Sequence, residues 1–257
     1  MTRCEEMAER VRTAPHVIEL ARLLHGGKWY PSERKSNTGI GKTLEELLGI
    51  HENNFSKGDI EVPMVGLVEL KSSRIGSQSM ITLFTKSPEP RSVGNKQLLE
   101  RFGYYRNGSM FKELHFTLFY GHNLIDGKDL VLEITGNEEN RRIDLIDPSE
   151  NLVVAYYSER ALEQAAFNKL SSGLVLVEAE SKFVNTVEYF KYCKATYMCG
   201  LDINATFQLI RDKKLKLDLR LGTYKSGRSK GKPHDHGNGF RMFDKDLERL
   251  FSYKTEL

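Results

Sequence analysis

The sequence predicts an α/β fold in which a mixed sheet is flanked by helices. Stretches that alternate apolar and polar residues, as half-buried strands do, are interspersed with stretches whose apolar residues recur every three to four positions, as in amphipathic helices. The 257 residues, of which 39% are hydrophobic, are enough to bury a substantial core. We therefore expect one large domain or two lobes.

The expected elements begin with two helices, continue with several strands and end with alternating helices and strands. Residues 5–24 show a rough 3.6-residue periodicity, and a second helix is expected over 39–48, after the break at Pro31. Further strands are expected at 65–73, 79–85, 113–120, 129–135, 152–157, 174–179 and 215–221, and further helices at about 159–170, 204–214 and 244–251. This order suits a mixed sheet with helices on its faces.

The helix at 39–48 places an acidic side chain beside its core face. The apolar residues of that face are Ile40, Leu44, Leu47 and Leu48. Glu45 lies at the border of the face, nearer to it than Glu46 does. We therefore expect Glu45 to face sideways, toward a site.

The strand around residue 69 carries the strongest chemical signal. Because side chains alternate along a strand, Glu69 and Lys71 share one face, while Val68 and Leu70 enter the apolar layer on the other. If Asp59 arrives from the preceding strand or turn, two carboxylates can hold a divalent cation, and the lysine can orient the water that attacks a phosphodiester. This combination is typical of nucleases, although Glu-x-Lys is also a common solvent-facing pair on strands.

Positive charge is concentrated near the C-terminus. Residues 211–241 contain ten lysines and arginines against three aspartates, a net charge of +7 in a chain whose total is +3. Such asymmetry is typical of a surface that binds a polyanion, although a solvated loop has the same composition. Glycines within 224–241 let the backbone approach phosphates, which lysine and arginine neutralise. His234 and His236 could instead ligate zinc, but no third ligand stands at a persuasive spacing.

Asp218 and Arg220 lie two residues apart on the strand before that loop, and alternation places them on one face. A carboxylate that accepts from cytosine beside a guanidinium that donates to guanine would read neighbouring bases in the major groove. An ordinary ion pair on a solvated strand is an equally good interpretation of these two residue types.

Several function classes are disfavoured. No run of about 18 apolar residues could span a bilayer, and the charged first residues lack a signal-peptide core, so we expect a cytoplasmic protein without a membrane partner. The spacing of Cys4, Cys193 and Cys199 matches no common zinc motif. The sequence Gly41-Lys42-Thr43 resembles the end of a P-loop, but the required upstream glycine is Ser36.

Four segments closely resemble the MvaI/BcnI family of type II restriction endonucleases, which is related to the mismatch-repair nicking enzyme MutH. They are SNTGIGKTLEELLGI (36–50), MITLFTKSPEPR (80–91), VEAES (177–181) and LDLRLGTYKSGRSKGKPHDHGNGFRM (217–242). The resemblance implies a PD-(D/E)XK, restriction-endonuclease-like fold whose two lobes form a DNA-binding cleft. Residues 1–182 would be mainly the catalytic lobe and 183–257 mainly the DNA-recognition lobe, with an approximate boundary that leaves room for interleaving.

The resemblance also assigns roles. Asp59, Glu69 and Lys71 match the catalytic triplet, Glu45 matches the acid on the preceding helix, and Asp59 and Glu69 would bind Mg²⁺. Glu61 is an alternative first ligand, because the gap from Asp59 to Glu69 is longer than expected. The residues expected to bind DNA, as base readers or through phosphates, are Asp218, Arg220, Lys225, Arg228, Lys230, Lys232, His234, Asp235, His236 and Arg241.

The activity that the resemblance implies is Mg²⁺-dependent hydrolysis of double-stranded DNA at a short GC-rich pseudopalindrome of the CC-N-GG kind. A monomer would make two successive nicks, and a cognate DNA methyltransferase is a possible partner. A MutH-like repair endonuclease that nicks one strand, and a catalytically inactive DNA-binding module, are the alternatives. The acidic residues and Lys71 argue against the inactive module, and the long basic loop favours a protein that finds its site unaided.

Overall fold

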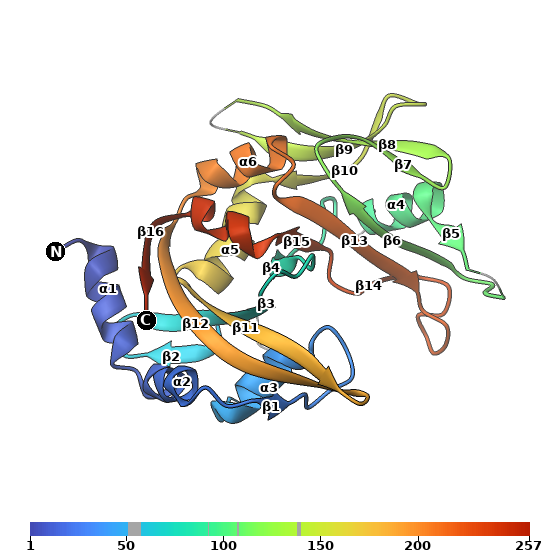
Figure 1. The fold of residues 1–257 in the computed structure, drawn as a ribbon. Helices are drawn as coiled ribbons and strands as arrows, with labels where there is room; N and C mark the ends of the chain where they lie inside the picture. Colours follow the sequence, from blue (N-terminus) through green and yellow to red (C-terminus); the bar gives the residue numbers. More distant parts are fainter. Residues whose placement is uncertain (51–57, 92, 107, 138–139) are drawn as a thin grey trace. The chain divides into compact units, whose positions relative to one another are not determined.

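The computed structural model describes residues 1–50, 58–91, 93–106, 108–137 and 140–257. The chain forms two compact units that alternate along the sequence (Figure 1). Unit 1 comprises Met1–Ile81, Phe167–Asp202 and Phe243–Leu257. Unit 2 comprises Thr82–Ala166 and Ile203–Met242. The assignment of catalysis mainly to residues 1–182 and of DNA recognition mainly to residues 183–257 stays a prediction.

Unit 1 contains a mixed sheet. Its strands are ordered β1 (Tyr30–Pro31), β12 (Val187–Leu201), β11 (Leu174–Val184), β3 (Gly66–Arg74) and β2 (Ile60–Val62), and β16 (Phe251–Glu256) also pairs with β12. β3 and β11 run parallel, whereas the other pairs are antiparallel. The crossover from β3 to β11 is what makes the sheet mixed, as the sequence predicts.

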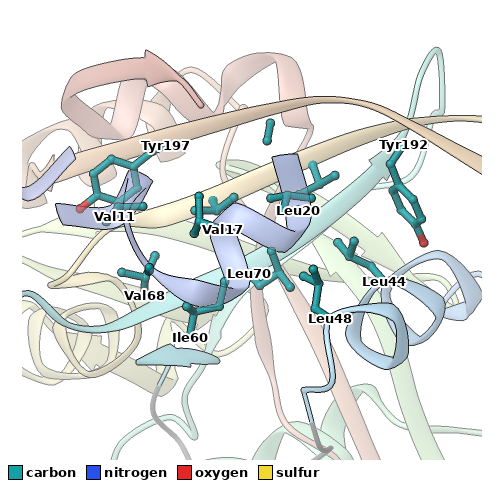
Figure 2. Close-up of a cluster of buried hydrophobic side chains, with 14 of the residues drawn as sticks. Val11, Val17, Leu20, Leu44, Leu48, Ile60, Val68, Leu70, Tyr192 and Tyr197 are labelled. Carbon is teal, nitrogen blue, oxygen red and sulfur yellow. The ribbon is translucent and has the colours of Figure 1, made fainter. Parts of the chain in front are cut away.

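Helices cover one face of this sheet and bury its apolar side chains. They are α1 (Arg3–Arg12), α2 (Pro15–Gly26) and α3 (Gly39–Leu47). In Figure 2, Val17 and Leu20 of α2 and Leu44 of α3 lie over Val68 and Leu70 of β3. Val68 and Leu70 are buried in this core, so the side chains at the positions between them face away from it.

The helix expected over 5–24 is in fact two helices. α1 begins with a capping box between Thr2 and Glu5, and α2 begins at Pro15. Proline lacks a backbone N–H and disfavours helical geometry in the residue before it, and Ala14 is accordingly extended, with φ −67° and ψ 138°. The break at Pro15 was therefore present in the sequence, but apolar periodicity on both sides concealed it.

Unit 2 is built on two antiparallel sheets. The first has the order β10 (Leu152–Ser158), β9 (Arg142–Asp147), β8 (Lys128–Thr135) and β7 (Gly121–Ile125). The second has the order β4 (Ile81–Thr85), β15 (Gly239–Met242), β13 (Lys216–Thr223), β6 (Lys112–Leu118) and β5 (Tyr104–Tyr105), with β14 (Pro233–Asp235) on β13. Helices α4 (Gly94–Phe102) and α6 (Ile203–Arg211) belong to this unit, and α5 (Glu159–Leu170) passes from unit 2 into unit 1 after Ala166.

The predicted α/β class is confirmed, and the main omissions concern strands with irregular patterns. The longest unpredicted strand is β12, whose alternation is interrupted because its pairing with β11 shifts register between Glu178 and Ala179. The helix α4 and the strands β7 and β9 were also unpredicted. The helix expected at 244–251 is a short 3₁₀ helix, Asp244–Leu250, followed by β16. Within the described part of the chain, no helix is both long and apolar enough to cross a membrane.

Candidate active site and nucleic-acid interface

The strand β3 brings Glu69 and Lys71 together on the face opposite the helices. Lys71 Nζ donates to Glu69 Oε1 over 2.5 Å. The Glu69 side chain is only 1% exposed, whereas that of Lys71 is 26% exposed. The predicted alternation along β3 is therefore confirmed, and the pair is not the solvated one that the residue types alone allowed.

Asp59 lies directly beside this pair. Its backbone N–H donates to the Val68 carbonyl, and its Oδ2 accepts from the Leu70 N–H, both over 2.9 Å. At the preceding position only glycine fits, because a Cβ on Gly58 would lie 2.6 Å from the Leu67 carbonyl oxygen. The close approach of two backbones thus carries the Asp59 carboxylate to β3. The side chain of Glu61, the alternative acid, is exposed on β2.

The pKa of Glu69 is raised above its ordinary value. Burial is the largest cause and the negative charge of Asp59 adds to it, while Lys71 and Lys169 act in the opposite direction. Two carboxylates are thus held close together in a poorly solvated place. A hard divalent cation would relieve this repulsion.

The donor set fits Mg²⁺, which is commonly held by one or two carboxylates and retains several waters. Among the described residues, no group of three or more His, Cys, Asp or Glu side chains is arranged to hold a metal. A site based on Asp59 and Glu69 would therefore need oxygen ligands from water, backbone or substrate.

Lys169 also reaches this site, and sequence reasoning missed it. Its Nζ lies 3.3 Å from Glu69 Oε2 and 3.5 Å from Oε1. It lies one position before Leu170, whose side chain is buried with those of Leu162 and Ala166 on one face of α5. That periodicity could have placed Lys169 at the border of a buried face, but nothing in the sequence linked it to a residue 100 positions away.

Glu45 occupies the place in α3 that the sequence predicts. Ile40, Leu44 and Leu48 are buried, and Glu45 is partly buried while Glu46 is exposed. The helix packs against β3, so Glu45 belongs to the same unit as Asp59 and Glu69. Its role in catalysis stays a prediction.

We expect Glu69→Gln to become more stabilising as pH rises. Because the pKa of Glu69 is higher in the folded than in the unfolded chain, its contribution to stability is fully present below the unfolded value and is lost as pH rises through the folded value. The glutamine variant lacks this loss. Denaturant unfolding at pH 4 and pH 8 without divalent cations measures the difference, with Glu61→Gln as the exposed control. A gain in unfolding free energy of Glu69→Gln over the original protein that shrinks with rising pH would contradict the raised pKa of Glu69.

In unit 2, Asp218 joins two arginines. Its Oδ2 accepts from Arg220 Nε over 2.8 Å and from Arg241 Nη1 over 3.0 Å, and its Oδ1 accepts from Thr117 Oγ1 over 2.7 Å. Burial alone would raise the pKa of Asp218, but the hydrogen bonds from Thr117 and Arg220 and the two guanidinium charges outweigh it and lower the pKa. Leu217, Leu219 and Leu221 are buried, which confirms the predicted alternation. Asp218 thereby orients two arginine side chains that are partly exposed.

Aromatic rings form a row beside these arginines. Tyr224 stacks on His234 with ring centroids 4.2 Å apart, and His234 lies 4.1 Å from His236. His115 of β6 follows at 6.1 Å. Burial and the neighbouring imidazoles lower the pKa of His236. A Cβ at Gly222 would lie 2.8 Å from His236 Nε2, so a larger residue there would have to displace the imidazole.

Asp235 lies between the two histidines in sequence, but its carboxylate accepts hydrogen bonds from other residues of unit 2. Its Oδ1 accepts from the N–H groups of Gly237 and Asn238, and its Oδ2 accepts from Ser87 Oγ and Asn95 Nδ2. These contacts tie the chain after β14 to α4 and to the loop before it. Asp235 is thus arranged to fix the positions of the histidines rather than to extend outward.

The basic loop between β13 and β14 presents exposed cations. Tyr224 and Lys232 close it through a backbone hydrogen bond of 3.0 Å, and a second bond joins Gly231 N–H to the Tyr224 carbonyl. The exposed basic side chains of the loop are Lys225, Arg228, Lys230 and Lys232. The residues predicted to bind DNA therefore all belong to unit 2, and those predicted to be catalytic all belong to unit 1.

Comparisons with known proteins indicate the family and the fold. The model of the MvaI/BcnI restriction endonuclease family matches residues 18–251. A solved complex of restriction endonuclease MvaI with cognate DNA substrate is 30% identical, with 93% of this chain and 95% of that chain covered and a TM-score of 0.76. MvaI in the absence of DNA is 26% identical, with 96% and 97% covered and a TM-score of 0.60. No curated protein matches the chain.

Proposed function

The chain belongs to the MvaI/BcnI restriction endonuclease family and is a type II restriction endonuclease, a site-specific deoxyribonuclease; we propose that it cuts DNA with Mg²⁺ held by Asp59 and Glu69. The observation that carries this proposal is the buried Glu69 carboxylate, which lies within 2.5 Å of Lys71 Nζ and is close enough to feel the charge of Asp59. A buried acid beside a second acid is unfavourable by itself, and such perturbed groups cluster at functional sites.

Each residue of unit 1 has a separate task in the proposed mechanism. Asp59 and Glu69, with the Leu70 carbonyl as a further oxygen, would hold Mg²⁺, which when bound neutralises charge on the scissile phosphate. Lys71 positions the attacking water, and Glu45 orients groups around the site. The products are 5′-phosphate and 3′-hydroxyl ends.

Unit 2 is proposed to recognise the site in double-stranded DNA. Arg220 and Arg241 are held by Asp218 and their side chains are partly exposed, which suits donation to guanine O6 and N7. We propose a GC-rich pseudopalindrome of the CC-N-GG kind, with His234 and His236 at its centre. The described residues of one chain contain one proposed catalytic set, so a monomer would cut the two strands in successive nicks. A methyltransferase acting on the same site is the proposed partner.

Incubation of the purified protein with plasmid DNA and Mg²⁺ tests this function. We expect nicked circles to precede linear DNA, a chelator to stop both, and sequencing of the ends to return one short motif with 5′-phosphates. Nicking of one strand only, dependent on an added protein, would favour the MutH-like alternative. Binding without any cleavage would favour an inactive module.

Raising the salt concentration should weaken DNA binding steeply, with the logarithm of the binding constant linear in the logarithm of salt, because phosphate contacts release counterions. Replacing Lys225, Arg228, Lys230 and Lys232 together by methionine should reduce the slope by about 3 to 4, since each phosphate contact contributes about 0.9. Fluorescence anisotropy over a salt series measures both slopes. An unchanged slope in the variant would remove this loop from the interface.

A further inference from the structure

Lys169 and Lys71 both contact the Glu69 carboxylate, but in different ways. Lys71 is two residues away on the same strand and makes one short bond, 2.5 Å, to Oε1. Lys169 reaches from the end of α5 and lies near both oxygens, at 3.3 Å from Oε2 and 3.5 Å from Oε1. Its side chain is 24% exposed, whereas that of Glu69 is 1% exposed.

Among the described residues whose charges act on Glu69, the charges balance without a metal. Glu69 and Asp59 contribute two negative charges, and Lys71 and Lys169 contribute two positive ones. A carboxylate that is 1% exposed requires such compensation, because an unpaired charge in a poorly solvated place is strongly unfavourable. A divalent cation bound by the two acids would supply two positive charges, as many as the two lysines together, so Glu69 would no longer need Lys169 as a counter-charge.

We infer that Lys169 is a positioning residue that stands in for the divalent cation: it holds Glu69 in the cation-free protein and releases it when the cation binds. This inference rests on the proposed metal site at Asp59 and Glu69. Lys169 rather than Lys71 leaves, because its contacts are longer and it approaches from α5, whereas the strand itself places Lys71 on the same face as Glu69. Lys169 therefore stabilises the empty site and competes with the metal.

If Lys169 competes with the metal, its removal should lower the unfolding temperature of the cation-free protein and raise the affinity for a divalent cation, both measured without DNA. In Lys169→Met, we expect the cation-free protein to unfold roughly 2–4 °C lower, because Glu69 loses a counter-charge. We expect the same variant to bind Mn²⁺, which takes oxygen ligands as Mg²⁺ does, at least about threefold more tightly. Electron paramagnetic resonance of free Mn²⁺ measures this affinity. Lys169→Arg keeps the charge and should resemble the original protein in both measurements.

Two further variants separate this effect from general electrostatics and from misfolding. Lys194→Met removes a lysine that pairs with Glu178 over 3.6 Å elsewhere on the same sheet, and it should leave Mn²⁺ affinity unchanged. Lys169→Gln also removes the charge but retains a polar side chain, so it replaces Lys169→Met in the test if the methionine variant does not fold. It should likewise bind Mn²⁺ more tightly than the original protein.

The outcomes distinguish this inference from the function on which it rests. Tighter Mn²⁺ binding by Lys169→Met or Lys169→Gln, but not by Lys169→Arg or Lys194→Met, supports it. Equal or weaker binding by the neutral variants, when the original protein binds Mn²⁺ normally, overturns the inference and leaves the proposed metal site intact. Failure of the original protein to bind Mn²⁺ would overturn both.

Discussion

Replacing Lys71 by methionine should abolish DNA cleavage while specific DNA binding persists. Lys71 Nζ is the only amine on β3 beside Glu69 among the described residues, and it is 26% exposed, so it can meet both the carboxylate and a water at the scissile phosphate. Loss of a group that positions or activates a nucleophile costs roughly 10²–10⁴-fold in rate. Single-turnover cleavage with Mg²⁺ measures the loss, and anisotropy without Mg²⁺ measures binding.

A matched control is available within unit 1. Lys191 is 29% exposed and pairs with Glu180 over 2.8 Å, so Lys191→Met removes a comparable side chain and ion pair without touching Glu69. We expect its cleavage rate to stay within a few-fold of the original, since a surface ion pair contributes about 1 kcal/mol or less. Equal losses of binding and cleavage in Lys71→Met would assign Lys71 to the DNA interface instead of the chemistry.

The substitution Arg241→Ala should weaken binding to the specific site by about 1–3 kcal/mol and change nonspecific binding little. Arg241 and Arg220 share one oxygen of Asp218, so loss of Arg241 also removes one of the groups that hold the carboxylate to which Arg220 donates. Anisotropy titrations with the site identified by end sequencing, and with unrelated DNA, measure the two affinities. A parallel decrease in both would mean that Arg241 contacts phosphate and reads no base.

Arg101→Ala is the matched control for Arg241→Ala. Arg101 lies in the same unit, is 28% exposed against 26% for Arg241, and also donates to an aspartate, Asp147, over 3.0 Å. Both variants lose an arginine–aspartate pair with a separation of 3.0 Å, and Arg101→Ala also loses a pair with Glu150. If the predicted interface is correct, only Arg241→Ala should change the preference for the specific site.

Much of the catalytic site could be predicted because its geometry is local. Glu69 and Lys71 are two residues apart on a strand, and period-two alternation forces them onto one face once Val68 and Leu70 are buried. The same rule placed Asp218 and Arg220 together on β13. A 3.6-residue period likewise separated Glu45 from the exposed Glu46.

What alternation cannot supply is any contact between distant segments. The sequence offered Glu61 as a rival to Asp59, and only the close backbone approach at Gly58 shows which acid lies beside Glu69. Asp235 appeared equivalent to its histidine neighbours, yet its carboxylate accepts from Ser87 and Asn95, far away in the sequence. Strand β12 escaped prediction because a register shift breaks its period.

The sequence by itself determined the class of fold, the family and the residues whose partners lie within one strand or helix, because backbone periodicity fixes the faces of an element without reference to the rest of the chain. Only the tertiary structure decided how much of each site is buried and which distant charges share it. Burial depends on what packs above a residue, and the approach of Lys169 from α5 to Glu69 spans 100 positions. No local pattern records such a contact, since it is set by the packing of the whole unit.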